Sequence, residues 1–271
     1  MKLLSGNKII GLDNQVSNGN SLTPKLPFSM ILSASKGKGK SSTLINMLIN
    51  NDMLAGKFNQ IHIISPTNKL DAKFNILKET NGILKPNLPL LKLFKNKMKN
   101  QIISSPNETP EYNSVLTDSD FYEKVSIDLL KDIIKDQKFI IENYGKSIAD
   151  NILLVYDDTA SQKKFWNSSA VQQLIFNSRH YKISIIITTQ NYHSIPKPIR
   201  LNTSLFILYY TANLTELKSI YDENNSNLTF KQFSSMFSKV CNSKDYNFLV
   251  INYQNNELHR YQECFEEFIT N

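Results

Sequence analysis

The feature that most constrains this chain is a short glycine- and lysine-rich loop at residues 34–41, which reads Ala-Ser-Lys-Gly-Lys-Gly-Lys-Ser. An apolar run at residues 27–33 precedes the loop, and apolar residues at helical spacing follow it over residues 43–54. A loop of this composition between a strand and a helix is typical of sites that cradle nucleotide phosphates. The sequence therefore predicts a Walker A loop, with an unliganded lysine-rich turn as the alternative.

The residues of this loop have distinct expected roles. Gly37 and Gly39 permit the backbone to point its N–H groups inward at phosphate oxygens. The Lys40 ammonium is expected to reach the β- and γ-phosphates of ATP, and the Ser41 hydroxyl to bind Mg²⁺. The first position of the pattern is usually glycine but is Ala34 here, which is tolerated if φ is negative. The predicted nucleotide-binding residues are Ala34, Ser35, Lys36, Gly37, Lys38, Gly39, Lys40, Ser41 and Ser42.

Two carboxylates follow the apolar run at residues 152–156, in the pattern of a Walker B strand. Asp157 is expected to bind Mg²⁺, and Asp158 is expected to polarise the attacking water. The alternative is that this pair caps the next helix. The apolar run at 183–187 leads to Gln190, which is our candidate for a sensor that contacts both the γ-phosphate and the water.

The order of apolar runs and amphipathic segments predicts the fold class. Unalternating strands are expected at 27–33, 61–64, 152–156, 183–187, 205–209 and 248–252, with helices at 43–54, 119–144, 161–178, 214–221 and 229–240. Such strands separated by helices indicate an α/β fold, in which helices flank a mostly parallel central sheet. The expected organisation is an N-terminal arm (1–26), a P-loop ATPase domain (27–262) with a largely helical insertion at about 68–150, and a C-terminal tail (263–271).

The charge of the chain favours an anionic partner. The formal net charge is +7, which is compatible with nucleic acid, although solubility alone also explains it. Arginine occurs only at Arg179, Arg200 and Arg260. In a chain that otherwise uses lysine, these positions are candidates for a fixed planar donor. The lysine-rich stretch at 92–99 and the pair at 163–164 are candidate phosphate-backbone contacts.

Other compositional features exclude several classes. Cys241 and Cys264 lack the spacing of a metal site, so they are expected to be reduced thiols. No apolar run approaches the roughly 18 residues of a membrane span, and the first 20 residues are too weak for a secretory signal. We therefore expect an intracellular protein without a membrane partner. Residues 68–71, Asn-Lys-Leu-Asp, match the Asn-Lys-x-Asp motif with which GTPases recognise guanine. They follow the second strand, however, where no base pocket is expected, and this position disfavours a GTPase.

Taken together, four blocks of this sequence resemble the viral genome-packaging ATPases of large DNA viruses and virophages, in the FtsK/HerA branch of P-loop motors. The blocks are the loop at 33–42, the strand end at 64–67, the strand and aspartates at 154–158, and the segment from Ser178 onward. That last segment holds Arg179-His180, then Thr189-Gln190, then the proline-rich stretch ending in Arg200-Leu201-Asn202.

This resemblance implies a RecA-like P-loop NTPase of the ASCE type, in which the strand ending in Gln190 lies between the P-loop strand and the Asp157 strand. It implies a homo-oligomeric ring that moves double-stranded DNA into a capsid without reading its sequence, beside a capsid portal or vertex protein. The expected location is the virion, the host cytoplasm or a viral factory. Ring motors complete their sites with an arginine of the neighbouring subunit, and Arg179 and Arg200 are the candidates, with Arg179 preferred.

Three other functions stay open at this point. A P-loop small-molecule or nucleotide kinase is the first, although such kinases normally carry an arginine-rich lid. The second is a non-catalytic assembly protein, which would have no need of Asp158. The third is another nucleic-acid-dependent ATPase, such as a helicase or a conjugation pump.

Overall fold

A single mixed sheet organises the computed structural model, which describes residues 21–67, 72–90, 115–224 and 228–269. Within these residues the strand order is β3-β2-β4-β5-β1-β6-β7-β8-β9. The strands from β3 to β6 in this order pair in parallel, whereas β7, β8 and β9 each pair antiparallel with the preceding strand. The bounds are β1 Ser29–Ser33, β2 Gln60–Ile64, β3 Phe121–Tyr122, β4 Ile152–Tyr156, β5 Ile183–Thr189, β6 Leu205–Tyr209, β7 Phe248–Asn252, β8 Tyr261–Glu263 and β9 Glu267–Phe268.

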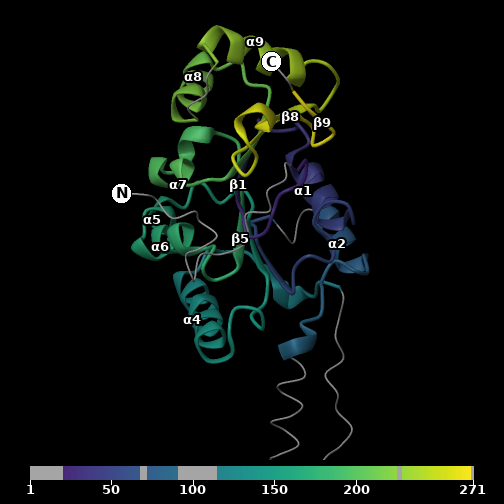
Figure 1. Cartoon of the computed structure of the whole chain (residues 1–271), viewed down its shortest axis with the longest axis vertical. Coiled ribbons are helices and arrows are strands. Elements are labelled where there is room, and N and C mark those ends of the chain that lie inside the picture. Colours follow the sequence, from purple (N-terminus) through teal and green to yellow (C-terminus); the bar gives the residue numbers. More distant parts are fainter. Residues whose placement is uncertain (1–20, 68–71, 91–114, 225–227, 270–271) are drawn as a thin grey trace, which may run out of the picture.

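Helices cover both faces of the sheet, which explains why its central strands are apolar at successive positions. Figure 1 shows α1 and α2 on one side of β1 and β5, and α4, α5, α6 and α7 on the other. Side chains alternate between the two layers, so that Ile31 packs toward α4 to α9 whereas Met30 and Leu32 pack toward α1 and α2. The helices are α1 Lys40–Ile49, α2 Asn75–Glu79, α4 Ile127–Tyr144, α5 Lys163–Trp166, α6 Ser169–Asn177, α7 Lys197–Leu201, α8 Leu214–Glu223 and α9 Phe230–Cys241.

The three central strands end at one edge of the sheet. In the register, Ser33 at the end of β1 pairs with Thr189 at the end of β5, and Tyr156 at the end of β4 pairs with Ile187. β5 therefore lies between β1 and β4, as expected from the resemblance. The α/β prediction with a mostly parallel sheet is confirmed, and the loops after β1, β4 and β5 emerge side by side at this carboxyl edge.

Serine side chains cap two helices at positions other than the predicted starts. The helix expected over 119–144 begins only at Ile127, where the Ser126 hydroxyl accepts the Leu129 N–H, and Phe121–Tyr122 instead forms the edge strand β3. The helix expected over 161–178 is two helices, because Ser168 caps a new start at Ser169. The helix expected over 43–54 ends at Ile49, before the left-handed Gly56.

The two ends of the described chain meet the sheet. Residues 21–26 of the predicted arm run beside the turn after β7, where the Ser21 N–H donates to the Asn255 side chain and the Lys25 N–H to that of Gln254. The predicted C-terminal tail (263–271) includes β9, which pairs antiparallel with β8. In the described part of the chain, no helix combines the length and the apolar character that crossing a membrane requires.

Candidate nucleotide-binding site

The loop between β1 and α1 has the backbone that the two glycines were expected to provide. Gly37 has a φ of 80° and Gly39 a φ of 88°, both in the left-handed region that other L-residues rarely adopt. Ala34 is not among the described non-glycine residues with positive φ, and its N–H donates to the Thr189 carbonyl at 3.1 Å. Alanine at the first position is therefore compatible with this loop. α1 begins directly after Gly39, so its free N–H groups face the loop.

The side chain of Lys40 is buried at the base of the loop and forms an ion pair with Asp158. Its exposed fraction is 8%, which places the ammonium inside the cleft rather than in bulk water. The residue predicted to bind phosphate and the residue predicted to polarise water are thus in direct contact, although they belong to different strands' loops.

Asp157 is held by two hydroxyl groups. The Thr188 hydroxyl donates to Oδ1 at 2.6 Å, and the Ser65 hydroxyl donates to Oδ2 at 3.0 Å. Burial raises the pKa of this carboxyl and the neighbouring Asp158 charge raises it further, while both hydroxyls and Lys40 act in the opposite direction. Ser65 and Thr188 were given no individual role in the sequence analysis, because a hydroxyl at a strand end has no signature until its carboxylate partner is located.

Asp158 projects from a backbone with a φ of 50°, a conformation that is uncommon for residues other than glycine, asparagine and aspartate. Its N–H donates to the Thr188 hydroxyl at 3.1 Å. Gln190 Nε2 lies 3.4 Å from Asp158 Oδ2, so the predicted sensor reaches the predicted water-polarising carboxylate. Thr188 therefore contacts both aspartates, and the loops after β4 and β5 form one polar cluster.

An open cleft of about 800 Å³ lies over this cluster. Its walls come from the phosphate loop, the start of α1 and the ends of β2, β4 and β5. The lining includes five residues to which the sequence analysis gave no site role, namely Thr43, Asn46, Thr67, Lys73 and Tyr246. The other lining residues are Ser35, Lys36, Gly37, Gly39, Lys40, Ser41, Ser42, Asp158 and Gln190.

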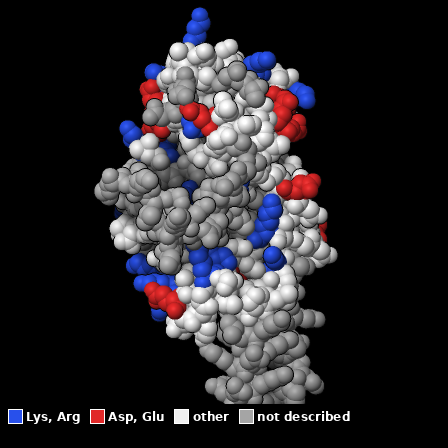
Figure 2. Space-filling model, viewed as in Figure 1, with Lys and Arg blue, Asp and Glu red and all other residues white. Residues whose placement is uncertain are grey.

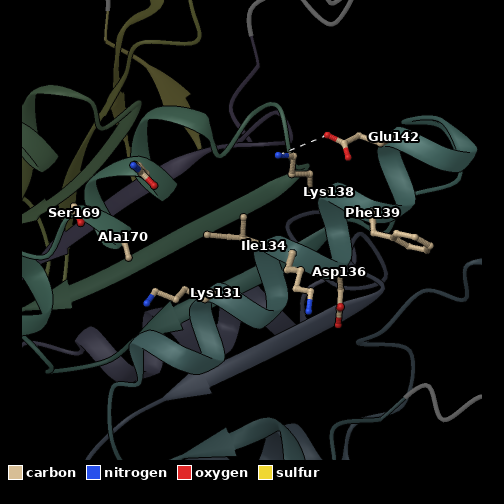
Figure 3. Close-up of a pocket in the computed structure, with 10 residues that line it drawn as sticks. Lys131, Ile134, Asp136, Lys138, Phe139, Glu142, Ser169 and Ala170 are labelled. Atoms are coloured by element: carbon tan, nitrogen blue, oxygen red, sulfur yellow. Dashed lines mark ion pairs between the residues drawn. The ribbon is translucent and has the colours of Figure 1, made fainter.

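Another cavity, of about 710 Å³, lies between α4 and α6 and contains none of the predicted site residues. Figure 3 shows Lys131 and Ile134 extending from α4 toward the α6 side, and it shows the Lys138–Glu142 ion pair farther along α4. On the face in Figure 2, basic side chains gather in the lower part of the described surface, around α4.

The structure places Arg200, the other arginine candidate, in contacts within its own chain. Its guanidinium forms a bidentate pair with Glu223 at 2.8 and 2.5 Å, and Nη1 donates to the Ile195 carbonyl at 2.7 Å. The Tyr192 ring lies against the guanidinium, at 4.7 Å from the ring centroid, and its hydroxyl donates to the same glutamate. Only 7% of its side chain is exposed, so these contacts within its own chain enclose Arg200.

Arg179 lies at the opposite end of β5 from Gln190. It is exposed in the turn between α6 and β5, and it borders a cavity with Phe176, Asn202 and Tyr253. The seven residues of β5 span about 20 Å, so Arg179 cannot reach the cleft of its own chain. A role at a nucleotide requires the cleft of a second copy, and that role stays a prediction.

Of the two candidate DNA contacts, only one falls within the described residues. Lys163 and Lys164 are exposed on α5, whereas the stretch at 92–99 lies outside the described residues. The Asn-Lys-Leu-Asp sequence at 68–71 also lies outside them.

Comparisons with known proteins agree with this architecture. The solved genome packaging NTPase B204 from Sulfolobus turreted icosahedral virus 2 resembles the chain in its complexes with sulfate (TM-score 0.52, 17% identity, 89% of this chain and 96% of that one) and with AMP (TM-score 0.50, 16% identity, 88% and 96%). This similarity shows the P-loop NTPase fold.

Two curated viral proteins share part of the sequence. Uncharacterized protein 075L of Invertebrate iridescent virus 6 is 30% identical over 112 residues, which are 41% of this chain. Uncharacterized protein L437 of Acanthamoeba polyphaga mimivirus is 25% identical over 118 residues, also 41% of this chain. The chain spans 42% of the length of each of these relatives.

The family model described as Poxvirus A32 protein matches residues 87–256 of this chain. The matched segment contains Asp157, Asp158, Gln190 and Tyr246, and it begins after the phosphate loop, whose assignment depends on the geometry above. Because the match covers more than half of the sequence, this chain belongs to the Poxvirus A32 protein family.

Proposed function

We propose that this chain is an ATP-hydrolysing motor that translocates double-stranded DNA into a viral capsid. Membership of the Poxvirus A32 protein family and the shared fold with a genome packaging NTPase support this proposal. The observation that carries it is the convergence of Lys40, Asp158 and Gln190, from the loops after three adjacent strands, at one phosphate loop.

The arrangement suits hydrolysis of the terminal phosphoryl group. The loop N–H groups and the Lys40 ammonium bind the β- and γ-phosphates, and Lys40 then exchanges its contact with Asp158 for phosphate oxygen. Asp158 accepts a proton from the water that Gln190 helps to orient. The water oxygen forms a bond to the γ-phosphorus while the bond to the β–γ bridging oxygen breaks, which yields ADP and inorganic phosphate.

The side chains present fit Mg²⁺ at this site. Mg²⁺ prefers oxygen donors and usually combines one or two carboxylates with phosphate oxygens and waters. Ser41 lines the cleft, and the Asp157 carboxylate is fixed by Ser65 and Thr188, so Ser41 and Asp157 would hold the ion. When bound, the ion neutralises charge on the phosphate oxygens. The two hydroxyls fix the position of the buried Asp157 carboxylate.

We further propose a homo-oligomeric ring in which Arg179 of one subunit completes the cleft of the next. Its exposure and its place at the far end of β5 support an action between subunits rather than within one. The ring would act at a capsid portal or vertex, in the virion or the infected cell. A motor of this kind contacts DNA phosphates and not base edges, and the exposed Lys163 and Lys164 are candidates for such contacts.

Displacement of a third strand tests this function directly. A fluorescent triplex-forming oligonucleotide is annealed to a linear duplex, and its release by the full chain is followed with ATP, with ATPγS and for Lys40→Ala. A motor on duplex DNA releases the oligonucleotide only with ATP and only with Lys40 present. Lys138→Ala, which removes an exposed α4 lysine outside the cleft, is the matched control and should behave as the native chain does.

Each alternative function gives a different outcome in the same assay. A helicase would separate the two duplex strands as well as the third strand. A kinase or an assembly protein would leave the triplex intact, and either result would contradict the proposal.

A further inference from the structure

An exposed tyrosine stands beside the phosphate loop, on the wall of the cleft away from the aspartates. Tyr246 belongs to the connection between α9 and β7, and 65% of its surface is exposed. Its ring lies against Gly39, because Cδ1 is 3.2 Å from the place where a Cβ on that glycine would be. Tyr246 also lines the cleft that Lys40 and Asp158 share.

The strand order places different kinds of residue on the two sides of the phosphate loop. Asp158 and Gln190 follow β4 and β5, on one side of β1. Tyr246 precedes β7, two strands away on the other side of β1, and β7 begins at the carboxyl edge because Phe248 pairs with Tyr209 at the end of β6. The phosphate loop therefore has a carboxylate side and an aromatic side, both at the same edge of the sheet.

A nucleotide bound at the phosphate loop would extend from the Asp158 side of the loop to the Tyr246 side. If its γ-phosphate is near Asp158, its sugar and base extend past the loop toward the aromatic side. The Tyr246 side chain is exposed there, and its backbone holds a φ of 65°, which is unusual for a bulky residue. Residues held in such sparsely populated conformations cluster at ligand sites.

We propose that Tyr246 is the platform on which the base of the nucleotide stacks. The inference rests on the proposed function, since it assumes that a nucleoside triphosphate occupies the cleft. Stacking on an aromatic ring uses the π face that every base has, while the tyrosine hydroxyl stays in water. The contact also gives a second reason for glycine at position 39, because a side chain there would displace the ring.

The test compares a ligand that has a base with one that lacks it. Binding of ATPγS and of tripolyphosphate, each with Mg²⁺, is measured by calorimetry on the full native chain, Tyr246→Ala, Tyr246→Phe and Lys40→Ala. Loss of one stacking contact should weaken ATPγS binding roughly tenfold in Tyr246→Ala and leave tripolyphosphate binding unchanged. Tyr246→Phe keeps the ring and should restore the affinity for ATPγS. Phe139→Ala, another exposed aromatic residue, is the control outside the cleft.

Two results would overturn the inference while the proposed function stands. Equal weakening of both ligands in Tyr246→Ala would mean that the ring supports the loop and not the base. Unchanged ATPγS binding in Tyr246→Ala, together with its loss in Lys40→Ala, would mean that the base lies elsewhere. Failure of the native chain to bind either ligand would instead count against the proposed function itself.

Discussion

The ammonium of Lys40 and the carboxylate of Asp158 form an ion pair across the cleft, although 118 positions separate them in the sequence. The pair joins the group expected to hold phosphate to the group expected to activate water. Phosphate binding must therefore compete with Asp158 for the lysine, which couples nucleotide entry to the release of the carboxylate. Because of this coupling, the roles of Lys40 in binding and of Asp158 in hydrolysis can be measured separately.

Replacing Asp158 with asparagine should separate binding from hydrolysis. Asparagine removes the charge that holds Lys40, so affinity for ATPγS should be equal or higher than in the native chain. It also removes the proton acceptor, so turnover should fall by about 10²- to 10⁴-fold. Calorimetric titration and steady-state phosphate release check the two parts. A variant that loses binding as well as turnover would show that Asp158 supports the loop instead.

The hydroxyl of Thr188 should matter more than its size. It donates to the buried Asp157 carboxylate and accepts the partly buried Asp158 N–H, so Thr188→Val leaves both groups without this partner. We expect a loss of about 1–3 kcal/mol in unfolding free energy and a large loss of turnover. Thr188→Ser retains the hydroxyl and should recover most of the turnover. Urea unfolding and kcat measured on both variants test this, and equal turnover in the two would contradict it.

Arg200 should contribute to stability and not to the chemistry of a neighbour. Its removal leaves the largely buried Glu223 carboxylate with the Tyr192 hydroxyl but no cation, so Arg200→Met should lower the unfolding free energy by about 3–5 kcal/mol. The double variant Arg200→Met, Glu223→Gln should regain part of that loss. Chemical denaturation of both variants checks the order, and a fully stable single variant would exclude a structural role.

The same ion pair predicts how stability depends on pH. Burial acts to raise the pKa of Glu223, but the Arg200 and Tyr192 hydrogen bonds outweigh it, so the folded pKa lies below the ordinary 4.5. The ion pair's stabilisation is therefore fully present above pH 4.5 and is lost as the pH falls through the folded pKa. Melting curves in acid should show a steeper loss for the native chain than for Glu223→Gln. Parallel curves would contradict the assignment.

Mixing two inactive variants tests the proposed role of Arg179 between subunits. Lys40→Ala retains the arginine and Arg179→Ala retains the phosphate loop, so a mixed ring contains some complete interfaces. Random assembly should restore roughly a quarter of the native turnover, because each interface needs one subunit of each kind in order. The two variants measured alone provide the baseline. A mixture no more active than that baseline would place Arg179 outside the site.

Local sequence was sufficient for the parts of this site that lie next to each other in the chain. The two glycines, Lys40 and the paired aspartates are each recognisable because a turn or a buried strand flanks them directly. Long-range contacts were not predictable in the same way. The scarcity of arginine drew attention to Arg200, but its partner Glu223 is 23 residues away, on α8. The residues adjacent to Tyr246 in the sequence form no motif that marks it as a site residue. It lies beside Gly39 only because β7 pairs antiparallel with β6.

The predicted helix and strand boundaries differ from the structure where the same residues fit both a helical and a strand pattern. Phe121 and Tyr122 fit the apolar stripe of the following helix, yet their pairing with Ile63 and Ile64 makes them an edge strand. The β8–β9 hairpin is too short to give a strand pattern of its own. Its pairing with β7 depends on tertiary contacts that a single sequence does not encode locally.

The most direct test of the central claim is steady-state ATP hydrolysis by the full chain, with and without long double-stranded DNA. The native chain and Lys138→Ala should hydrolyse ATP faster when DNA is present, whereas Lys40→Ala and Asp158→Asn should show no DNA-stimulated turnover. Turnover that is indifferent to DNA, or that survives in Asp158→Asn, would contradict a DNA-translocating motor built on the Lys40–Asp158 cleft.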